Sequence, residues 1–201
     1  MPTRRLAVHR AWGIFAVAFA TLLFAAGFRS AIGVLIDPLR AQFGWSRATV
    51  SLATSINVVL FGFMGPFAAA LQARYGLRRV TTVALLVVSA GAFGTTAMTR
   101  PWHLYLLWGV VVGAGNGCMA TVFASTVASR WFVRHRGLVV GALTAATASG
   151  QLVFLPLLGY LASDVGWRWV GITIGIGALA AVPLVALFLV NSPESIGLRL
   201  Y

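Results

Sequence analysis

An arginine lies deep inside the first long apolar stretch of the sequence. Arg29 belongs to a run that extends from Trp12 to Ile36. A charged side chain at the centre of a bilayer costs about 2.5–3.5 kcal/mol on insertion scales, so it normally faces a wet cavity or a partner. A guanidinium can bind a carboxylate through two parallel hydrogen bonds without giving up its own proton. We interpret Arg29 as an anion ligand in a cavity; the alternatives are extension to the outer headgroups or an ion pair with Asp37.

Three amide side chains lie near the middle of other apolar stretches. These are Asn57, Asn116 and Gln151. Such an amide can bind substrate oxygens or water, or it can form an interhelical hydrogen bond, which is typically worth about 0.6 kcal/mol. Both roles stay open for Asn57 and Asn116. The position of Gln151, beside Gly150 and five residues before Pro156, favours the substrate role.

The apolar stretches that position these residues are long enough to cross a bilayer. The chain is 60% hydrophobic and 9% charged, which is too apolar for a soluble domain. The alternation of a membrane barrel is absent, so the spans should be helices of about 20 residues or more. We predict an all-α membrane protein with one six-helix transmembrane domain over residues 1–201. Its expected spans are Trp12–Ile36, Ser46–Ala73, Val80–Met98, Trp102–Ser129, Gly137–Ser163 and Trp169–Val190.

The basic residues lie between the apolar stretches and predict the orientation. The net charge is +12, and topology together with anionic lipid headgroups explains this excess better than nucleic-acid binding does. With the amino terminus inside, one face holds Arg4, Arg5, Arg10, Arg74, Arg78, Arg79, Arg130, Arg134, Arg136 and Arg199, and the other holds Arg40, Arg47, Arg100 and Arg168. Arginine is retained on the cytoplasmic side of short loops. We therefore expect a multi-pass protein of the inner or plasma membrane with both termini in the cytoplasm.

A turn that joins two of the predicted spans is repeated later in the chain. The spacing of Pro66, Gly76 and Arg78 returns in Pro156, Gly166 and Arg168. The first of these turns is expected to face inward and the second outward. This relation predicts an inverted repeat of three plus three helices, and the alternative is a chance likeness between two Gly/Arg turns.

Glycines recur every four residues in two of the spans. One set is Gly109, Gly113 and Gly117, and the other is Gly137 and Gly141. Small residues at this spacing allow helices to approach closely. We therefore expect both sets to lie at helix–helix contacts.

The turn after the second span resembles the cytoplasmic loop signature of the major facilitator superfamily. Leu71, Arg74, Gly76, Arg78 and Arg79 match that signature, whereas Ala73 stands where it has an aspartate. The resemblance implies half of a major facilitator fold, in which Arg74, Gly76, Arg78 and Arg79 form a cytoplasmic gating loop.

Other segments are similar to the oxalate/formate antiporter and monocarboxylate transporter branches. They are the segment 43–47, the Arg130-Trp131-Phe132 triplet and the segment 193–198. Arg29-Ser30, eight residues before Asp37, resembles a lysine–serine pair with the same acidic spacing in monocarboxylate transporters. That lysine is implicated in substrate binding, so the resemblance implies a substrate-binding role for Arg29 and Ser30. In the family the first, second, fourth and fifth helices line the cavity, which would add Asn57, Asn116 and Gln151.

The resemblance implies a secondary active transporter, and no enzymatic activity is expected. The expected substrate is a small organic anion, a mono- or dicarboxylate, moved by alternating access in symport or antiport. The chain corresponds to the first half of such a carrier, so its expected partners are membrane lipids and a second six-helix half or a second copy of itself. No cofactor or metal is expected. The alternative is a non-transporting membrane scaffold or an inactive truncated fragment; an intramembrane protease lacks the Ser–His or paired-Asp residues it would need at depth.

Overall fold

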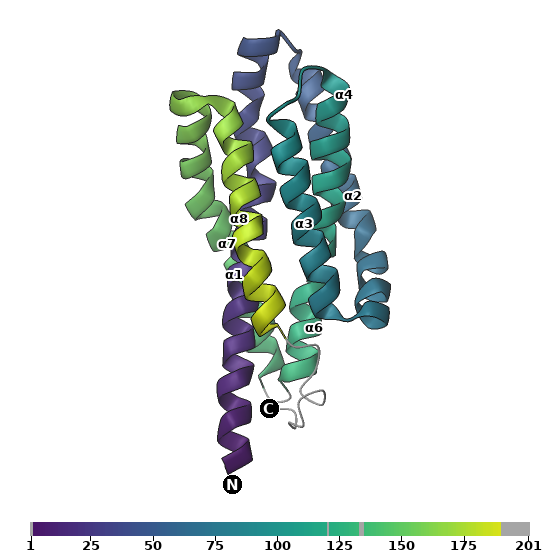
Figure 1. Cartoon of the computed structure of the whole chain (residues 1–201), viewed down its shortest axis with the longest axis vertical. Coiled ribbons are helices and arrows are strands. Elements are labelled where there is room, and N and C mark those ends of the chain that lie inside the picture. The colour runs from purple at the N-terminus through teal and green to yellow at the C-terminus, as the bar shows by residue number, and fades with distance from the viewer. Residues whose placement is uncertain (1, 120, 133–134, 190–201) are drawn as a thin grey trace.

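The computed structural model describes residues 2–119, 121–132 and 135–189, and all regular elements in these ranges are helical (Figure 1). Arg134, Arg199 and the segment 193–198 lie outside them. The elements are α1 (Pro2–Phe43), α2 (Arg47–Tyr75), α3 (Leu77–Thr95), α4 (Pro101–Leu104), the π-helical η1 (Tyr105–Val112), α5 (Gly113–Cys118), α6 (Thr121–Trp131), α7 (Arg136–Tyr160), the π-helical η2 (Leu161–Gly166) and α8 (Trp167–Phe188).

Five helical stretches are long and apolar enough to cross a membrane, as judged by length and composition. They are Trp12–Phe43, Arg47–Tyr75, Leu77–Thr95, Pro101–Trp131 and Arg136–Phe188. The fifth covers the last two predicted spans, because the chain reverses direction within it and α8 runs back along the bundle (Figure 1). The all-α prediction is confirmed.

Two glycines make the sharp reversals in the repeated turns. Gly76 lies between α2 and α3 with φ 85°, and Gly166 lies between η2 and α8 with φ 126°. Side chains with a Cβ rarely adopt such positive φ values, so glycine suits both positions. The turn at Gly76 lies toward the amino-terminal end of the bundle, whereas the α7–α8 reversal lies at the opposite end (Figure 1). This arrangement agrees with the predicted inverted repeat.

The first glycine set packs the rod formed by α4, η1, α5 and α6 against α2. A Cβ atom at Gly109 would lie 3.0 Å from Ile56, one at Gly113 would lie 3.0 Å from the Asn57 Cα, and one at Gly117 would lie 2.6 Å from Met64. The packing prediction is confirmed for this set.

The second glycine set does not pack in the same way. Nothing lies within 4 Å of a Cβ atom placed at Gly137 or Gly141 in the described part of the chain, so the prediction is wrong for this pair. The close contact of α7 is made at Gly150 instead, where a Cβ atom would lie 2.2 Å from the backbone oxygen of Leu23 on α1. Spacing alone therefore did not show which face of α7 meets a neighbour.

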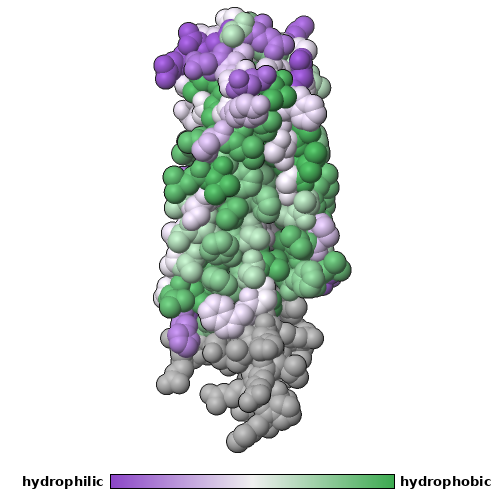
Figure 2. Space-filling view, turned by 90° about the vertical axis from the view of Figure 1, so that its left-hand side faces the viewer, coloured by the Kyte–Doolittle hydropathy of each residue, from purple (hydrophilic) through white to green (hydrophobic). Residues whose placement is uncertain are grey.

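The surface is divided into polar and apolar zones along the bundle. Figure 2 shows hydrophilic residues gathered at the end opposite the amino terminus, above a broad hydrophobic band. Large apolar side chains are exposed within the helices, such as Leu152 on α7 (77%) and Leu187 on α8 (72%). Exposed leucines on this scale suit contact with lipid rather than with water.

Candidate functional site

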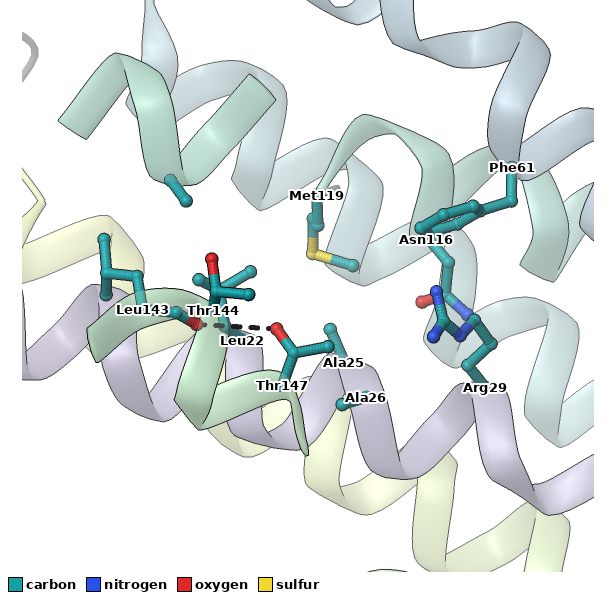
Figure 3. Close-up of a pocket in the computed structure, with 11 residues that line it drawn as sticks. Leu22, Ala25, Ala26, Arg29, Phe61, Asn116, Met119, Leu143, Thr144 and Thr147 are labelled. Atoms are coloured by element: carbon teal, nitrogen blue, oxygen red, sulfur yellow. Dashed lines mark hydrogen bonds between the residues drawn. The ribbon is translucent and has the colours of Figure 1, made fainter. Parts of the chain in front are cut away.

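A cavity of about 170 Å³ lies among α1, α2, α5, α6 and α7 (Figure 3). Its volume suits a small molecule better than a drug-sized ligand. Most of its wall is apolar, and the polar groups are confined to a few side chains. The lining residues are Leu22, Ala25, Ala26, Arg29, Phe61, Asn116, Met119, Ala124, Leu143, Thr144 and Thr147.

Arg29 supplies the charge in this cavity. Its guanidinium carbon lies 4.8 Å from the centroid of the Phe61 ring, close enough for a cation–π interaction. Asp37 is 89% exposed and pairs with Arg40 at 3.7 Å, so the structure does not place it as the partner of Arg29. The described lining residues include no acid, and the positive charge of Arg29 is therefore available to an anion.

Asn116 lies at the same end of the cavity as Arg29 (Figure 3). Its side chain is 2% exposed, and neither Nδ2 nor Oδ1 has a hydrogen-bond partner among the residues that the structure describes. A buried polar atom without a partner costs about 1–3 kcal/mol, which explains why such atoms are rare in folded proteins. A ligand with both acceptor and donor atoms would satisfy the amide while its anionic group contacts Arg29.

Two threonines that the sequence analysis did not select line the other end of the cavity. The Thr144 hydroxyl donates to the Val140 carbonyl at 2.9 Å. The Thr147 hydroxyl donates to the Leu143 carbonyl at 3.4 Å (Figure 3). Each oxygen keeps acceptor capacity for a ligand. Their spacing of three residues, with Gln151 four residues further along the same face, is the signal that could have identified them.

Three of the predicted substrate residues are not among the cavity-lining residues. Asn57 is 3% exposed and its Nδ2 donates to the Trp108 carbonyl at 2.8 Å, which is the interhelical role left open by the sequence. The Ser30 hydroxyl donates to the Ala26 carbonyl of its own helix at 3.2 Å. Gln151 is partly buried and lies one turn beyond Thr147. The structure thus brings Arg29 and Asn116 together and leaves the other three outside this cavity.

The predicted gating loop forms the tight joint between α2 and α3. The Gly76 amide donates to the Gln72 carbonyl at 3.1 Å, and the guanidinium carbon of Arg74 lies 5.3 Å from the Tyr75 ring centroid. Arg74, Arg78 and Arg79 are all exposed. The structure therefore presents three arginines on one turn, and their gating role stays a prediction.

The sequence is similar to known membrane transporters over most of its length. The Major Facilitator Superfamily profile matches residues 17–199. Monocarboxylate transporter 7 of Homo sapiens is 27% identical over 82% of this chain and 31% of its own length. Monocarboxylate transporter 11 of Mus musculus is 29% identical over 88% of this chain and 39% of its own length. An uncharacterized MFS-type transporter of Bacillus subtilis is 26% identical over 87% of this chain and 44% of its own length.

Solved structures share the fold at lower identity. A proton:xylose symporter bound to 6-bromo-6-deoxy-D-glucose superimposes with a TM-score of 0.78 at 17% identity, over 94% of this chain and 47% of that one. The inward-open xylose transporter of E. coli gives a TM-score of 0.75 at 17% identity, over 92% of this chain and 49% of that one. The chain thus spans less than half the length of each of these relatives and about half of each of these structures.

Proposed function

This chain belongs to the major facilitator superfamily, and we propose that it supplies one half of a secondary carrier that moves a small organic anion by alternating access. A mono- or dicarboxylate is the substrate class that its cavity suits. The observation that carries the proposal is that Arg29 and Asn116 line the same cavity. Among the described residues, no acid lines that cavity and the Asn116 amide has no hydrogen-bond partner.

The polar end of the cavity supplies what a carboxylate needs. The Arg29 guanidinium can donate two hydrogen bonds to the two carboxylate oxygens, and charge-assisted bonds of this kind are about twice as strong as neutral ones. The Asn116 Nδ2 can donate to a substrate oxygen, and its Oδ1 can accept from a substrate hydroxyl. Leu22, Met119 and Leu143 supply apolar contacts for a short carbon chain.

The similarity to proteins named monocarboxylate transporters supports the same substrate class. A single cation among the described lining residues suits one carboxylate directly; a second carboxylate would need another donor. The other half of the cavity would come from a second six-helix unit or from a second copy of this chain. We further propose that the carrier lies in the cell membrane with both termini in the cytoplasm, and that the turn at Gly76 is its cytoplasmic gating loop.

Counterflow in proteoliposomes tests the proposal. Vesicles preloaded with unlabelled lactate, pyruvate or oxalate would be diluted into the labelled anion, with xylose as a neutral control. We expect accumulation of at least one anion and none of xylose. Arg29→Ala should abolish this accumulation while the protein still inserts into the vesicles, because the anion loses its only charged donor in the described cavity wall.

Arg47→Ala is the matched control, since Arg47 is an exposed arginine at the start of α2 and does not line the cavity. It should retain wild-type counterflow. Unchanged anion uptake in Arg29→Ala would contradict the assigned site. Inserted wild-type protein that moves none of the anions would contradict a carrier made of two copies of this chain. The same failure after reconstitution with a separate second six-helix half would support the alternative of a non-transporting scaffold.

A further inference from the structure

A second cavity is lined by residues of α5 other than Asn116, which faces the Arg29 cavity. It has a volume of about 440 Å³ and lies between α2, α3 and α5. We call it the α2–α3 groove; it is lined by Met64, Leu71, Tyr75, Arg79, Val80, Val83, Ala84, Val87, Ala114, Gly115 and Cys118. Arg79 is the charged member of this set, and nearly all the other side chains are apolar.

Small residues on the floor create the groove. Ala84 of α3 and Ala114 and Cys118 of α5 are small, and they leave room that larger side chains would fill. Gly115 lets α5 approach α3 beneath the groove, because a Cβ atom there would lie 2.6 Å from Val88. The Gln72 Nε2 of α2 donates to the Cys118 carbonyl at 3.1 Å, which fastens this part of α5 to α2. The groove is therefore a preformed feature of the helix packing.

The groove is open at the side of the bundle, where its edge residues are exposed. Its wall on α3 extends from Arg79 to Val87, a distance of about 12 Å at 1.5 Å per helical residue. Leu71 and Val83 on its two edges are 37% and 58% exposed. In a bilayer such exposed leucine and valine side chains face hydrocarbon, so the natural filling is an acyl chain rather than water.

The mouth of the groove is strongly positive. Arg79 is exposed, and in the described part of the chain its guanidinium has no hydrogen-bond or ion-pair partner. Arg74 and Arg78 lie on the same turn, and the amino terminus of α3 adds its partial positive charge there. The two described acids, Asp37 and Asp164, belong to the far end of α1 and to η2, at the opposite end of the bundle (Figure 1).

Arg168, which matches Arg78 in the repeated turn, holds its own helix in place. The Arg168 Nε donates to the Thr96 carbonyl at 3.1 Å, and its guanidinium carbon lies 4.9 Å from the Trp167 ring centroid. That side chain fastens α8 to the end of α3. Arg79, the residue after Arg78, lines the opening of the apolar groove.

We propose that the α2–α3 groove binds one anionic phospholipid, with an acyl chain between α2 and α3 and the phosphate on the Arg79 guanidinium. A basic residue at a membrane surface attracts anionic lipid with about 1 kcal/mol, and a guanidinium matches the geometry of a phosphate. A lipid site needs a basic group for the phosphate and an apolar channel for the acyl chain. Arg79 supplies the first, and the groove supplies the second, because it begins at Arg79 and runs into the hydrocarbon layer. The bound lipid would anchor the turn between α2 and α3 to the bilayer leaflet in which that turn lies.

Photo-crosslinking of the full chain in nanodiscs tests this proposal. The probe is phosphatidylglycerol with a diazirine in one acyl chain, diluted into phosphatidylcholine, and the labelled peptides are mapped by mass spectrometry. We expect labelling of residues in the ranges 71–87 and 114–118. Unlabelled phosphatidylglycerol should displace the probe, whereas phosphatidylcholine and soluble glycerol phosphate should not.

Two variants and one control complete the test. Arg79→Gln should lower labelling of the groove by about fivefold, the effect of one basic residue near the membrane surface. Ala114→Leu should block the floor and lower labelling even though every arginine is kept. Arg47→Gln, at the other end of α2, should leave it unchanged.

Several outcomes would overturn the proposal. Labelling spread evenly over all lipid-facing helices, or equal displacement by phosphatidylcholine, would show general lipid contact rather than a site. Displacement by glycerol phosphate would assign Arg79 to a soluble anion. An equal loss of labelling in Arg47→Gln would attribute the effect to net charge.

Discussion

Asn57 and Asn116 are the same residue type, both lie near the middle of a membrane-length helix, and they are 3% and 2% exposed. Their amides nevertheless have opposite surroundings. The Asn57 Nδ2 donates across the α2–η1 contact to the Trp108 carbonyl, and its backbone packs against Gly113. In the described part of the chain neither amide atom of Asn116 has a partner, and the side chain lines the cavity that holds Arg29.

This difference separates a side chain that holds helices together from one that can bind a ligand. The hydrogen bond of Asn57 contributes to packing, and the side chain is buried at the α2–η1 contact rather than in the cavity wall. The unpartnered amide of Asn116 makes a poor contribution to stability, because it was removed from water without compensation. The two asparagines should therefore respond to the same substitution in opposite ways.

After Arg29→Ala, the largest loss of transport should come from Asn116→Leu. It removes a hydrogen bond to a charged substrate, which is worth about 1.5–3 kcal/mol, so anion counterflow should fall by roughly 10- to 100-fold. The thermal midpoint of the purified protein should stay the same or rise, because a buried amide without partners is lost. A wild-type rate of counterflow would remove Asn116 from the binding site.

Asn57→Leu should mainly affect stability. The Trp108 carbonyl loses its side-chain donor and the leucine crowds Gly113, so we expect a loss of about 1 kcal/mol in the free energy of unfolding. Thermal unfolding in detergent measures this loss. Counterflow per inserted molecule should remain close to that of the wild type; a loss as great as that of Asn116→Leu would place Asn57 in the transport pathway after all.

The double change Thr144→Val and Thr147→Val should have a smaller effect on counterflow. Both hydroxyls already donate to carbonyls of their own helix, so they offer a substrate only acceptor capacity. Valine keeps the shape of threonine and removes the oxygen. We expect a fall of about two- to fivefold, which corresponds to roughly 0.5–1 kcal/mol for one weak hydrogen bond. A fall as large as that of Asn116→Leu would move the centre of the site toward these threonines.

Gly113→Ala should have the smallest effect of the four. The new Cβ would lie 3.0 Å from the Asn57 Cα and 3.1 Å from its Nδ2, so α2 and α5 must separate slightly. We expect a loss of a few tenths to about 1 kcal/mol in the free energy of unfolding, part of it offset by the better helix propensity of alanine. Gly137→Ala is the matched control, because nothing lies within 4 Å of its Cβ position, and it should be neutral or stabilising. Equal losses in both variants would show that the Gly113 contact does not matter.

Features that depend on local residue order and composition could be predicted from the sequence alone. Long apolar runs predicted the helices, because a helix forms all its backbone hydrogen bonds within one segment and so needs no water inside the bilayer. The matched glycines predicted the turns at Gly76 and Gly166, since few other residues accept those φ values. Arg29 also indicated a cavity, because a charged residue deep inside an apolar span normally faces a wet cavity or a partner. This inference did not require knowing which residues surround it.

Which side chains share a space depends on how the helices pack. From the sequence, Asn57 and Asn116 were equally good candidates for the site, because each is an amide near the middle of a span and the local sequence does not show whether it faces a helix or a cavity. The sequence also selected Gly137 and Gly141 instead of Gly150, since the face of α7 that meets α1 depends on how the two helices cross. Hydrogen-bond partners such as the Trp108 carbonyl come from segments far apart in the chain, and their positions are set by packing rather than by spacing.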